Sequence, residues 1–279
     1  KDRLQLRDGS GHGLDGGLEA PPGGSAVLPD AQFWDDARRQ ALYEDHRGRR
    51  DAGGQGPVRC AHSSGHQDLP QHGGNIVIMN HLENHMETML PNEFRLTLDS
   101  HFVSSMILYK HYHEAPIRVV RKPELGWFGY QQYFDRLDYI YVYAGEADEE
   151  DRDRNLTRDQ RNHEFIDRAS ACLEQGYNLL IAPEGRCSYT EDSPGPFKVG
   201  AFRLAVTVKP EPLIIPIAVA NFDKRLTHTT TAAIVFPPFR LSEQMDDPED
   251  KDALYKFVNQ LQDKYREYVT QAIALASAE

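Results

Sequence analysis

The chain has 279 residues, enough for one large domain or two small ones, and 39% of them are hydrophobic. Its formal net charge of -12 argues against a general nucleic-acid binder, which needs a basic face. The 3 cysteines are too few and too scattered for a disulfide framework, and no run approaches the roughly 20 apolar residues of a membrane span. We therefore expect a cytoplasmic globular protein that is soluble or peripheral on a membrane.

Glycine divides the chain near residue 74. Most of the 21 glycines precede this point, together with Pro-Pro-Gly-Gly and Gly-Gly-Gln-Gly runs. A segment of this composition buries too little apolar surface to offset the entropy of ordering it. We predict that residues 1–73 form a flexible segment with at most one docked helix, around 31–43. Residues 74–279 are expected to form the folded domain, which ends in an amphipathic helix.

Strands and helices alternate along this domain. Short apolar runs rich in β-branched residues predict strands over 75–80, 117–120, 139–143, 178–182 and 213–219. Apolar residues at helical spacing predict helices over 83–90, 99–111, 157–175 and 249–275. The alternation predicts an α/β layered domain with a central, mostly parallel sheet flanked by helices. In such sheets, reactive groups gather where strand ends meet helix starts.

The first such junction holds His81, directly after a predicted buried strand, and Glu87, one to two helical turns later. A histidine oriented by a carboxylate is a common general base near neutral pH. No Ser or Cys lies nearby in the sequence, so direct attack by an acceptor hydroxyl fits better than an acyl-enzyme. The alternative interpretation is that His81 only caps the helix and packs.

A metal site is a second alternative at this junction. His81 and His85 stand at i and i+4, the spacing of metal ligands on a helix. The zinc-protease pattern, however, needs Glu directly after the first His, and Leu82 occupies that position. The zinc interpretation is therefore the weaker one.

The second junction pairs two cations, Arg121 and Lys122, with an aromatic loop that contains Leu125, Trp127 and Phe128. This composition suits an anionic head group beside an apolar tail. A charged loop over core aromatic residues is the alternative.

The third junction holds Glu184, Gly185 and Arg186 after a predicted strand, and Lys198 follows a proline-glycine loop. Arg186 and Lys198 are suited to binding a phosphate, the first by its fork and the second as a point charge. A turn with a surface ion pair is the alternative. Cys187 has no His beside it in the sequence, so we interpret it as a bystander thiol.

The order of these junctions resembles that of the glycerolipid acyltransferase family, which includes lysophosphatidate and glycerol-3-phosphate acyltransferases. The family has four blocks: Asn-His followed after four residues by Asp, a glycine-rich aromatic block with cations, Pro-Glu-Gly-Thr-Arg-Ser, and an apolar strand with a proline. The corresponding segments are 80–87, 122–142, 183–188 and 214–219.

Three positions depart from the family pattern. Met86 stands where the family has Asp, and Glu87 comes one residue late, which rotates a side chain by about 100° on a helix. Arg186 stands in place of Thr, and Cys187 in place of Arg. A catalytically inactive relative that binds lipid or acyl thioester is therefore the main alternative to an enzyme.

The resemblance implies an O-acyltransferase of phospholipid biosynthesis with no metal or organic cofactor. It would move a fatty acyl group from acyl-CoA or acyl carrier protein to a hydroxyl of glycerol-3-phosphate or a lysophospholipid. His81 would be the base and Glu87 its orienting carboxylate. The residues implied in substrate binding are Glu184, Gly185, Arg186, Lys198, Arg121 and Lys122. Leu125, Trp127, Phe128 and a helix over 102–108 would hold the acyl chain and touch a bilayer.

Overall fold

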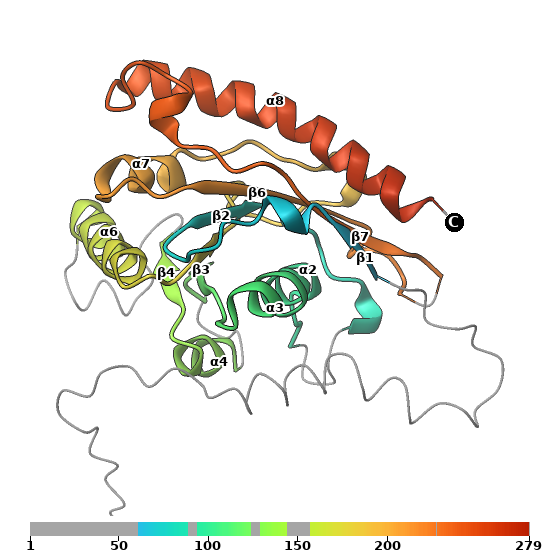
Figure 1. Ribbon diagram of the computed structural model, residues 1–279. Helices are drawn as coiled ribbons and strands as arrows, with labels where there is room; N and C mark the ends of the chain where they lie inside the picture. Colours follow the sequence, from blue (N-terminus) through green and yellow to red (C-terminus); the bar gives the residue numbers. More distant parts are fainter. Residues whose placement is uncertain (1–60, 89–93, 124–128, 144–156, 227, 279) are drawn as a thin grey trace, which may run out of the picture.

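A central sheet organises the protein (Figure 1). The computed structural model describes residues 61–88, 94–123, 129–143, 157–226 and 228–278. Its strands are β1 (Ala61–Ser64), β2 (Ile76–Met79), β3 (Ile117–Arg121), β4 (Ile140–Val142), β5 (Leu179–Ile181), β6 (Ile214–Ala220) and β7 (Thr231–Val235). In the order β1-β7-β6-β2-β5-β3-β4, every neighbouring pair is parallel except β6 and β7. The predicted α/β fold with a mostly parallel sheet is confirmed.

Helices cover both faces of this sheet. They are α2 (Leu98–Phe102), α3 (Tyr109–Tyr112), α4 (Tyr130–Arg136), α6 (Arg158–Glu174), α7 (Gly200–Thr207) and α8 (Lys251–Ala276). The π-helical segment η3 (Val103–Leu108) joins α2 to α3, so that residues 98–112 form one rod. Shorter 3-10 turns are η1 (His66–Asp68), η2 (Met86–Thr88), η4 (Thr190–Asp192) and η5 (Leu241–Glu243). In Figure 1, α7 and α8 lie above the sheet and the 98–112 rod lies below it.

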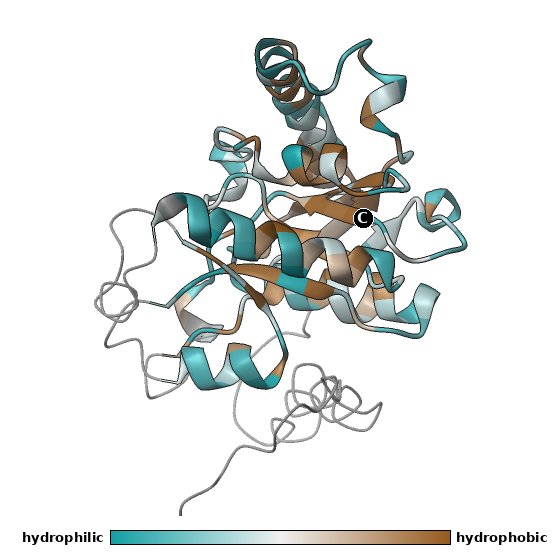
Figure 2. Ribbon diagram, turned by 90° about the vertical axis from the view of Figure 1, so that its left-hand side faces the viewer, coloured by the Kyte–Doolittle hydropathy of each residue, from teal (hydrophilic) through white to brown (hydrophobic). Residues whose placement is uncertain are grey.

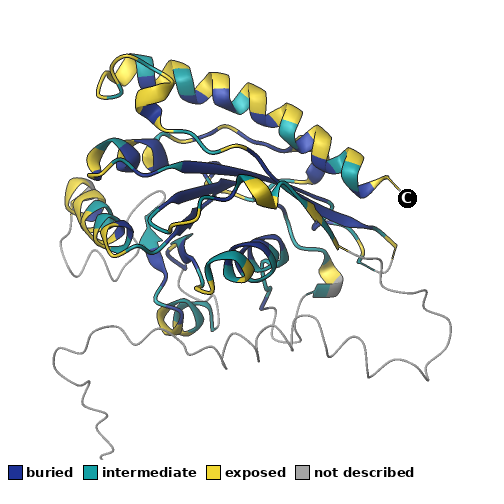
Figure 3. Ribbon diagram, in the orientation of Figure 1, coloured by how far each residue is buried: buried dark blue, intermediate teal, exposed yellow. Residues whose placement is uncertain are grey.

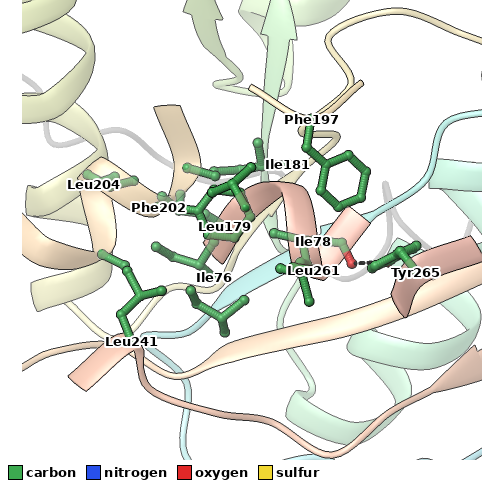
Figure 4. Close-up of a cluster of buried hydrophobic side chains, with 14 of the residues drawn as sticks. Ile76, Ile78, Leu179, Ile181, Phe197, Phe202, Leu204, Leu241, Leu261 and Tyr265 are labelled. Carbon is green, nitrogen blue, oxygen red and sulfur yellow. Dashed lines mark hydrogen bonds between the residues drawn. The ribbon is translucent and has the colours of Figure 1, made fainter. Parts of the chain in front are cut away.

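The core lies on both faces of the central strands. Because side chains alternate along a strand, Ile76 and Ile78 of β2 join the cluster under α6, α7 and α8. Val77 and Met79 point the other way and pack against the 98–112 rod. Figure 4 shows part of the first cluster. The sheet is apolar in Figure 2 and buried in Figure 3, while the outer surfaces of the helices are polar and exposed. Because helices cover both faces of the sheet, β2 and β6 are continuous apolar runs.

Capping residues set the ends of the long helices. At the start of α6, the Gln160 N–H donates to the Thr157 hydroxyl and the Thr157 N–H donates to the Gln160 side chain. Gly176 follows the end of α6 with a φ of 93°, a conformation that favours glycine. At α8, the Asp250 carboxylate accepts from two backbone N–H groups of the first turn. The predictions for both helices are confirmed.

The predicted helix over 83–90 is wrong in its described part. Only η2 is helical there, and the preceding backbone pairs with a distant segment. Leu82 forms a parallel bridge with Ser188, and the Glu83 N–H donates to the Ser188 carbonyl at 2.9 Å. Backbone groups engaged in this way cannot also form helical hydrogen bonds.

The fold begins before the predicted boundary at residue 74. β1 pairs with β7 at the edge of the sheet, and Leu69 is buried. The sequence of β1, Ala-His-Ser-Ser, has no apolar run, so its pattern does not predict a strand. β7, α4 and α7 were also not predicted. The predicted helix at 31–43 lies outside the described residues.

Candidate active site

Four neighbouring strands end at the edge of the sheet that carries the predicted motifs. β6, β2, β5 and β3 are adjacent in that order and run in the same direction. Asn80 directly follows β2, and its buried amide exchanges hydrogen bonds with the backbone of Val219 in β6, at 2.7 and 2.9 Å. The carboxyl ends of the strands therefore meet as predicted, and Asn80 fixes the position from which His81 projects.

His81 is oriented by a buried carboxylate. Its Nδ1 lies 2.6 Å from Oδ2 of Asp99, in the first turn of α2. Asp99 Oδ2 also accepts the Leu82 N–H at 2.8 Å, and Oδ1 accepts the Ser100 N–H at 2.6 Å. The carboxylate is 1% exposed, whereas the His81 side chain is 19% exposed. A fixed carboxylate thus holds one ring nitrogen while the imidazole stays accessible.

The charges of the pair stabilise each other. Burial alone would lower the pKa of His81, but the negative charge and hydrogen bond of Asp99, with a smaller contribution from Cys187, raise that pKa well above 6.5. Burial alone would raise the pKa of the Asp99 carboxyl, but His81 and the two backbone N–H donors lower that pKa overall. His81 is therefore a stronger proton acceptor than an ordinary histidine.

The carboxylate that contacts His81 in the described structure is that of Asp99. The predicted partner was Glu87, whose side chain lies outside the described part of η2. Asp99 stands 18 positions after His81, beyond the five of the family block, so a search by spacing did not find it. The available signal was an acidic residue in the first turn of the predicted helix 99–111.

Glu184 connects three segments around His81. Its carboxylate is 1% exposed and accepts the His81 N–H at 3.0 Å, the Ser188 hydroxyl at 2.9 Å and the Gly195 N–H at 2.6 Å. With both oxygens engaged inside the protein, it positions the site. The substrate-binding role predicted for Glu184 stays a prediction, and the hydrogen bonds give this residue a positioning role beside it.

Two exposed cations flank the turn that follows Glu184. Gly185 has a φ of 65°, and a Cβ there would lie 2.6 Å from Nζ of Lys198. A Cβ on Gly195 would lie 3.4 Å from Nε of Arg186. The positive φ favours glycine at 185, and the short distances show that Lys198 lies against this turn. The Gly185 N–H donates to the Ala182 carbonyl at 3.0 Å and is not available to an oxyanion.

The chain matches a known family over this whole region. The family model described as Acyltransferase matches residues 60–220, which include both partners of the His81–Asp99 pair and the Glu184 turn. The chain belongs to the acyltransferase family. The family resemblance seen in the motifs is confirmed.

One solved structure similar to this acyltransferase is that of the 1-acyl-sn-glycerophosphate (LPA) acyltransferase PlsC from Thermotoga maritima. It is 15% identical, with a TM-score of 0.45, over 75% of this chain and 72% of that chain. A comparison with curated proteins finds no match.

The second junction of the acyltransferase contributes one exposed and one buried cation. Arg121 is exposed at the end of β3. Lys122 is 9% exposed, and its Nζ lies 5.7 Å from the centre of the Tyr143 ring, which Arg161 approaches to 5.3 Å. Lys122 thus packs against an aromatic ring, which weakens the case for it as a phosphate ligand. Leu125, Trp127 and Phe128 lie outside the described residues.

A buried arginine that the sequence analysis missed supports the first turn of α2. Arg118 of β3 is 5% exposed and donates to the hydroxyls of Thr97, at 2.7 Å, and of Ser100. It also donates to the Tyr139 hydroxyl at 3.3 Å. Because Thr97 and Ser100 bracket Asp99, this contact helps to fix the carboxylate that orients His81.

The geometry behind the zinc alternative is wrong. Residues 81–85 are not helical, so His81 and His85 do not share a helical face. Within the described ranges, no three His, Cys, Asp or Glu side chains are placed to hold a metal ion. Of the helices in those ranges, none combines the length and apolar composition needed to span a membrane.

Proposed function

We propose that this acyltransferase moves a fatty acyl group from an acyl thioester to a hydroxyl of glycerol-3-phosphate or a lysophospholipid, in phospholipid biosynthesis. The observation that carries the proposal is the hydrogen bond between His81 and the buried Asp99. With Nδ1 held by the carboxylate, Nε2 is the nitrogen that takes the proton of the attacking hydroxyl. Asp99 then stabilises the imidazolium that forms, the same effect by which it raises the pKa of His81.

The two exposed cations at the Gly185 turn are assigned to the acceptor phosphate. Lys198 lies against Gly185 and Arg186 directly follows it, beside Glu184, whose carboxylate accepts the His81 N–H. A phosphate held there places its glycerol hydroxyl close to the base. Arg121 is a further exposed cation, on the neighbouring strand β3.

Exposed apolar side chains near the site are assigned to the acyl donor or to a membrane surface. Met86 is 60% exposed and follows the His81 segment, and Tyr189 is 57% exposed and follows the segment that pairs with it. By contrast, Val103, Ile107 and Leu108 of the predicted acyl-binding helix pack into the core. We therefore assign peripheral membrane contact to the exposed side chains of Met86 and Tyr189.

Thiol release from palmitoyl-CoA tests the proposal. The assay is run with glycerol-3-phosphate, with lysophosphatidate and without acceptor, and a palmitoyl carrier protein is tested in parallel as the donor. Acceptor-dependent release by the wild type should fall by about 10²–10⁴-fold in His81→Ala, the usual contribution of a general base. His163→Ala, which removes an exposed histidine of α6, is the matched control and should keep full activity.

The remaining outcomes separate the alternatives. Binding of palmitoyl-CoA without turnover, equal in wild type and His81→Ala, would indicate an inactive lipid-binding relative. Release that needs no acceptor and stops on chelation, with bound zinc in the purified protein, would indicate a metal-dependent hydrolase. Acceptor-dependent release that survives His81→Ala would contradict the assignment of the base.

A further inference from the structure

Arg118 binds the turn of α2 that carries Asp99. It lies in β3, paired with Leu180 of β5, so its backbone is held inside the sheet. Its guanidinium donates to the hydroxyl of Thr97 at 2.7 Å and to that of Ser100. These two hydroxyls lie 2.8 Å apart and share a hydrogen bond. One buried side chain from the sheet therefore holds residues on both sides of Asp99.

This contact diverts Thr97 from the usual role of its position. Thr97 precedes the first turn of α2, where a threonine hydroxyl commonly accepts a backbone N–H of the helix, but its side chain forms no such bond here. The Asp99 carboxylate takes over that role, because Oδ1 accepts the Ser100 N–H at 2.6 Å while Oδ2 contacts His81. The Thr97 hydroxyl is instead committed to Arg118, which ties the turn to β3.

Arg118 also brings a positive charge to this turn. It is 5% exposed, and the groups it contacts among the described residues are hydroxyls and the rings of Tyr139 and His101, none of them a carboxylate. Burial alone would lower the pKa of Arg118, whereas Tyr139 and Tyr133, and then the charge of Asp99, raise that pKa overall. A buried charge that contacts no partner of opposite sign is costly, so packing does not explain the guanidinium. The carboxylate whose charge acts on it is that of Asp99.

His101 bonds to the same turn without adding a charge. Its Nδ1 lies 2.7 Å from the Thr97 carbonyl, which can only accept, so Nδ1 carries the proton. Nε2 then accepts from the Tyr133 hydroxyl at 2.5 Å. Both ring nitrogens are thus satisfied in the neutral form, and burial with the charge of Arg118 lowers the pKa of His101 to about 4. At neutral pH, Arg118 is therefore the charged one of these two residues.

We propose that Arg118 is a positioning residue for acyl transfer, which aims the Asp99 carboxylate at His81 and keeps it ionised. This inference rests on the proposed function, in which His81 gains a positive charge when it takes the hydroxyl proton. A carboxylate that is already fixed and ionised stabilises this charge without having to reorganise. Arg118 is buried, and its contacts in the described structure do not include His81, so it acts through Asp99 and not on the reacting atoms.

The charge of Arg118 has two opposite effects on His81. Repulsion between the two cations would lower the pKa of His81, whereas a fixed and ionised Asp99 raises it. The Asp99 carboxylate lies 2.6 Å from the imidazole, and the guanidinium makes no contact with it. Because Coulomb energies fall with distance, the effect through Asp99 is the larger one. Loss of the guanidinium should therefore lower the pKa of His81.

Arg118→Met removes the charge and the donors and keeps a long apolar side chain. In the palmitoyl-CoA assay with lysophosphatidate, kcat should fall by about 10²-fold, the cost of misplacing a catalytic group by about 1 Å. The KM of donor and acceptor should change little, because the guanidinium is buried. The acid limb of the kcat/KM profile should move to lower pH. Arg118→Lys, which keeps the charge and loses the fork, should recover the wild-type acid limb and part of kcat.

The pKa of the His81 imidazole, followed by NMR, is a readout that needs no turnover. Its resonance is assigned by its loss in His81→Ala, and its pKa should be lower in Arg118→Met than in wild type. Phe202→Ala, which removes a fully buried ring under α8, is the control for lost stability and should leave this pKa unchanged. Urea titration verifies that each variant is folded. If Arg118→Met does not fold, Ser100→Ala, which removes one acceptor of the guanidinium, should shift the pKa in the same direction.

A double variant tests whether Arg118 acts through Asp99. Arg118→Met added to Asp99→Asn should slow the enzyme no further, because no carboxylate is left to aim. An unchanged His81 pKa in folded Arg118→Met, or a full additional loss of kcat in the double variant, would overturn the inference. A lowered His81 pKa in Arg118→Met, together with no acceptor-dependent release by the wild type, would support the link from Arg118 to Asp99 and contradict the proposed function.

Discussion

The two faces of the sheet are built from different interactions. The face under α6, α7 and α8 is packed with apolar side chains, and its buried tyrosine, Tyr265, bonds backbone carbonyls of β2 and β6. The face against the 98–112 rod has a smaller apolar cluster beside a buried polar network built around Asp99 and Arg118. The network extends through His101, whose Nε2 lies 2.5 Å from the Tyr133 hydroxyl.

The apolar face mainly stabilises the fold, and the polar face mainly orients side chains. Apolar contacts are non-directional and stabilise in proportion to the area they bury, so they hold the strands together without aiming a side chain. Hydrogen bonds fix directions, and those of the polar network converge on the carboxylate that orients His81. Substitutions on the first face should therefore lower stability, and those on the second should change the chemistry and its pH dependence.

The largest effect is expected for Asp99→Asn. The amide keeps the shape but removes the charge that raises the pKa of His81, so acceptor-dependent turnover should fall by about 10²–10⁴-fold. The acid limb of the kcat/KM profile, set above pH 6.5 in the wild type by the raised pKa, should move to lower pH.

A full pH profile of kcat/KM for thiol release measures both changes. Asp167→Asn, an exposed aspartate of α6, is the matched control and should leave the rate and the profile unchanged. An Asp99→Asn profile that superimposes on the wild type would mean that this carboxylate does not act through His81.

Phe202→Ala should have the largest effect on the apolar face. Phe202 is fully buried in the cluster under α8, and removing its ring should lower the free energy of unfolding by about 3–5 kcal/mol. Urea titration measures this loss, with Tyr255→Ala, a 48% exposed aromatic residue of α8, as the control. At a temperature where the variant is folded, its pH profile of kcat/KM should match that of the wild type. A shifted profile would show that the apolar face also affects the chemistry of His81.

The sequence predicts the apolar face better than the polar one. β2, β5 and β6 are buried strands with continuous apolar runs, and α8 carries a regular apolar stripe, so local patterns predict all four. β1 escapes prediction because its sequence, Ala-His-Ser-Ser, is polar, and β7 because three of its five residues are Thr or Ala. Their strand structure depends on pairing with each other and with β6.

The candidate site was also predicted only in part. His81, Gly185 and Lys198 were found because each belongs to a motif that is local in sequence. Asp99 was missed as the partner of His81 because 18 positions separate the two residues, and no local sequence pattern marks a contact across that segment. The sequence alone thus predicted His81 as the candidate base, but not the carboxylate that orients it.

The polar face should also set the acid stability of the fold, through His101. Burial, and then the charge of Arg118, lower the pKa of His101 to about 4, so it is neutral in the folded protein at pH 7. Because the unfolded pKa is 6.5, unfolded chains bind a proton between these values that folded chains do not. The stabilising contribution is present above pH 6.5 and is lost as the pH falls toward 4, on the order of 3 kcal/mol.

Urea titrations between pH 7 and pH 4.5 measure this loss in the free energy of unfolding. His101→Gln, which keeps hydrogen-bonding capacity but does not titrate, should show a flatter dependence on pH. The control His163→Ala, at an exposed position, should keep the wild-type slope. Equal slopes in wild type and His101→Gln would show that other groups cause the loss.

The smallest effect is expected for Tyr265→Phe, the one polar group of this set on the apolar face. The Tyr265 hydroxyl lies 2.6 Å from the Ile217 carbonyl and 3.0 Å from that of Ile78, close to the strand ends that carry the site. Its loss should cost about 1 kcal/mol and lower the Tm by about 2–4 °C, because a buried carbonyl loses a donor while the ring packing remains. Tyr255→Phe, exposed on the same helix, should change the Tm little. Since neither hydroxyl touches the His81–Asp99 pair, both variants should keep the wild-type pH profile of kcat/KM. A shifted midpoint in Tyr265→Phe alone would show that α8 also helps to aim the base.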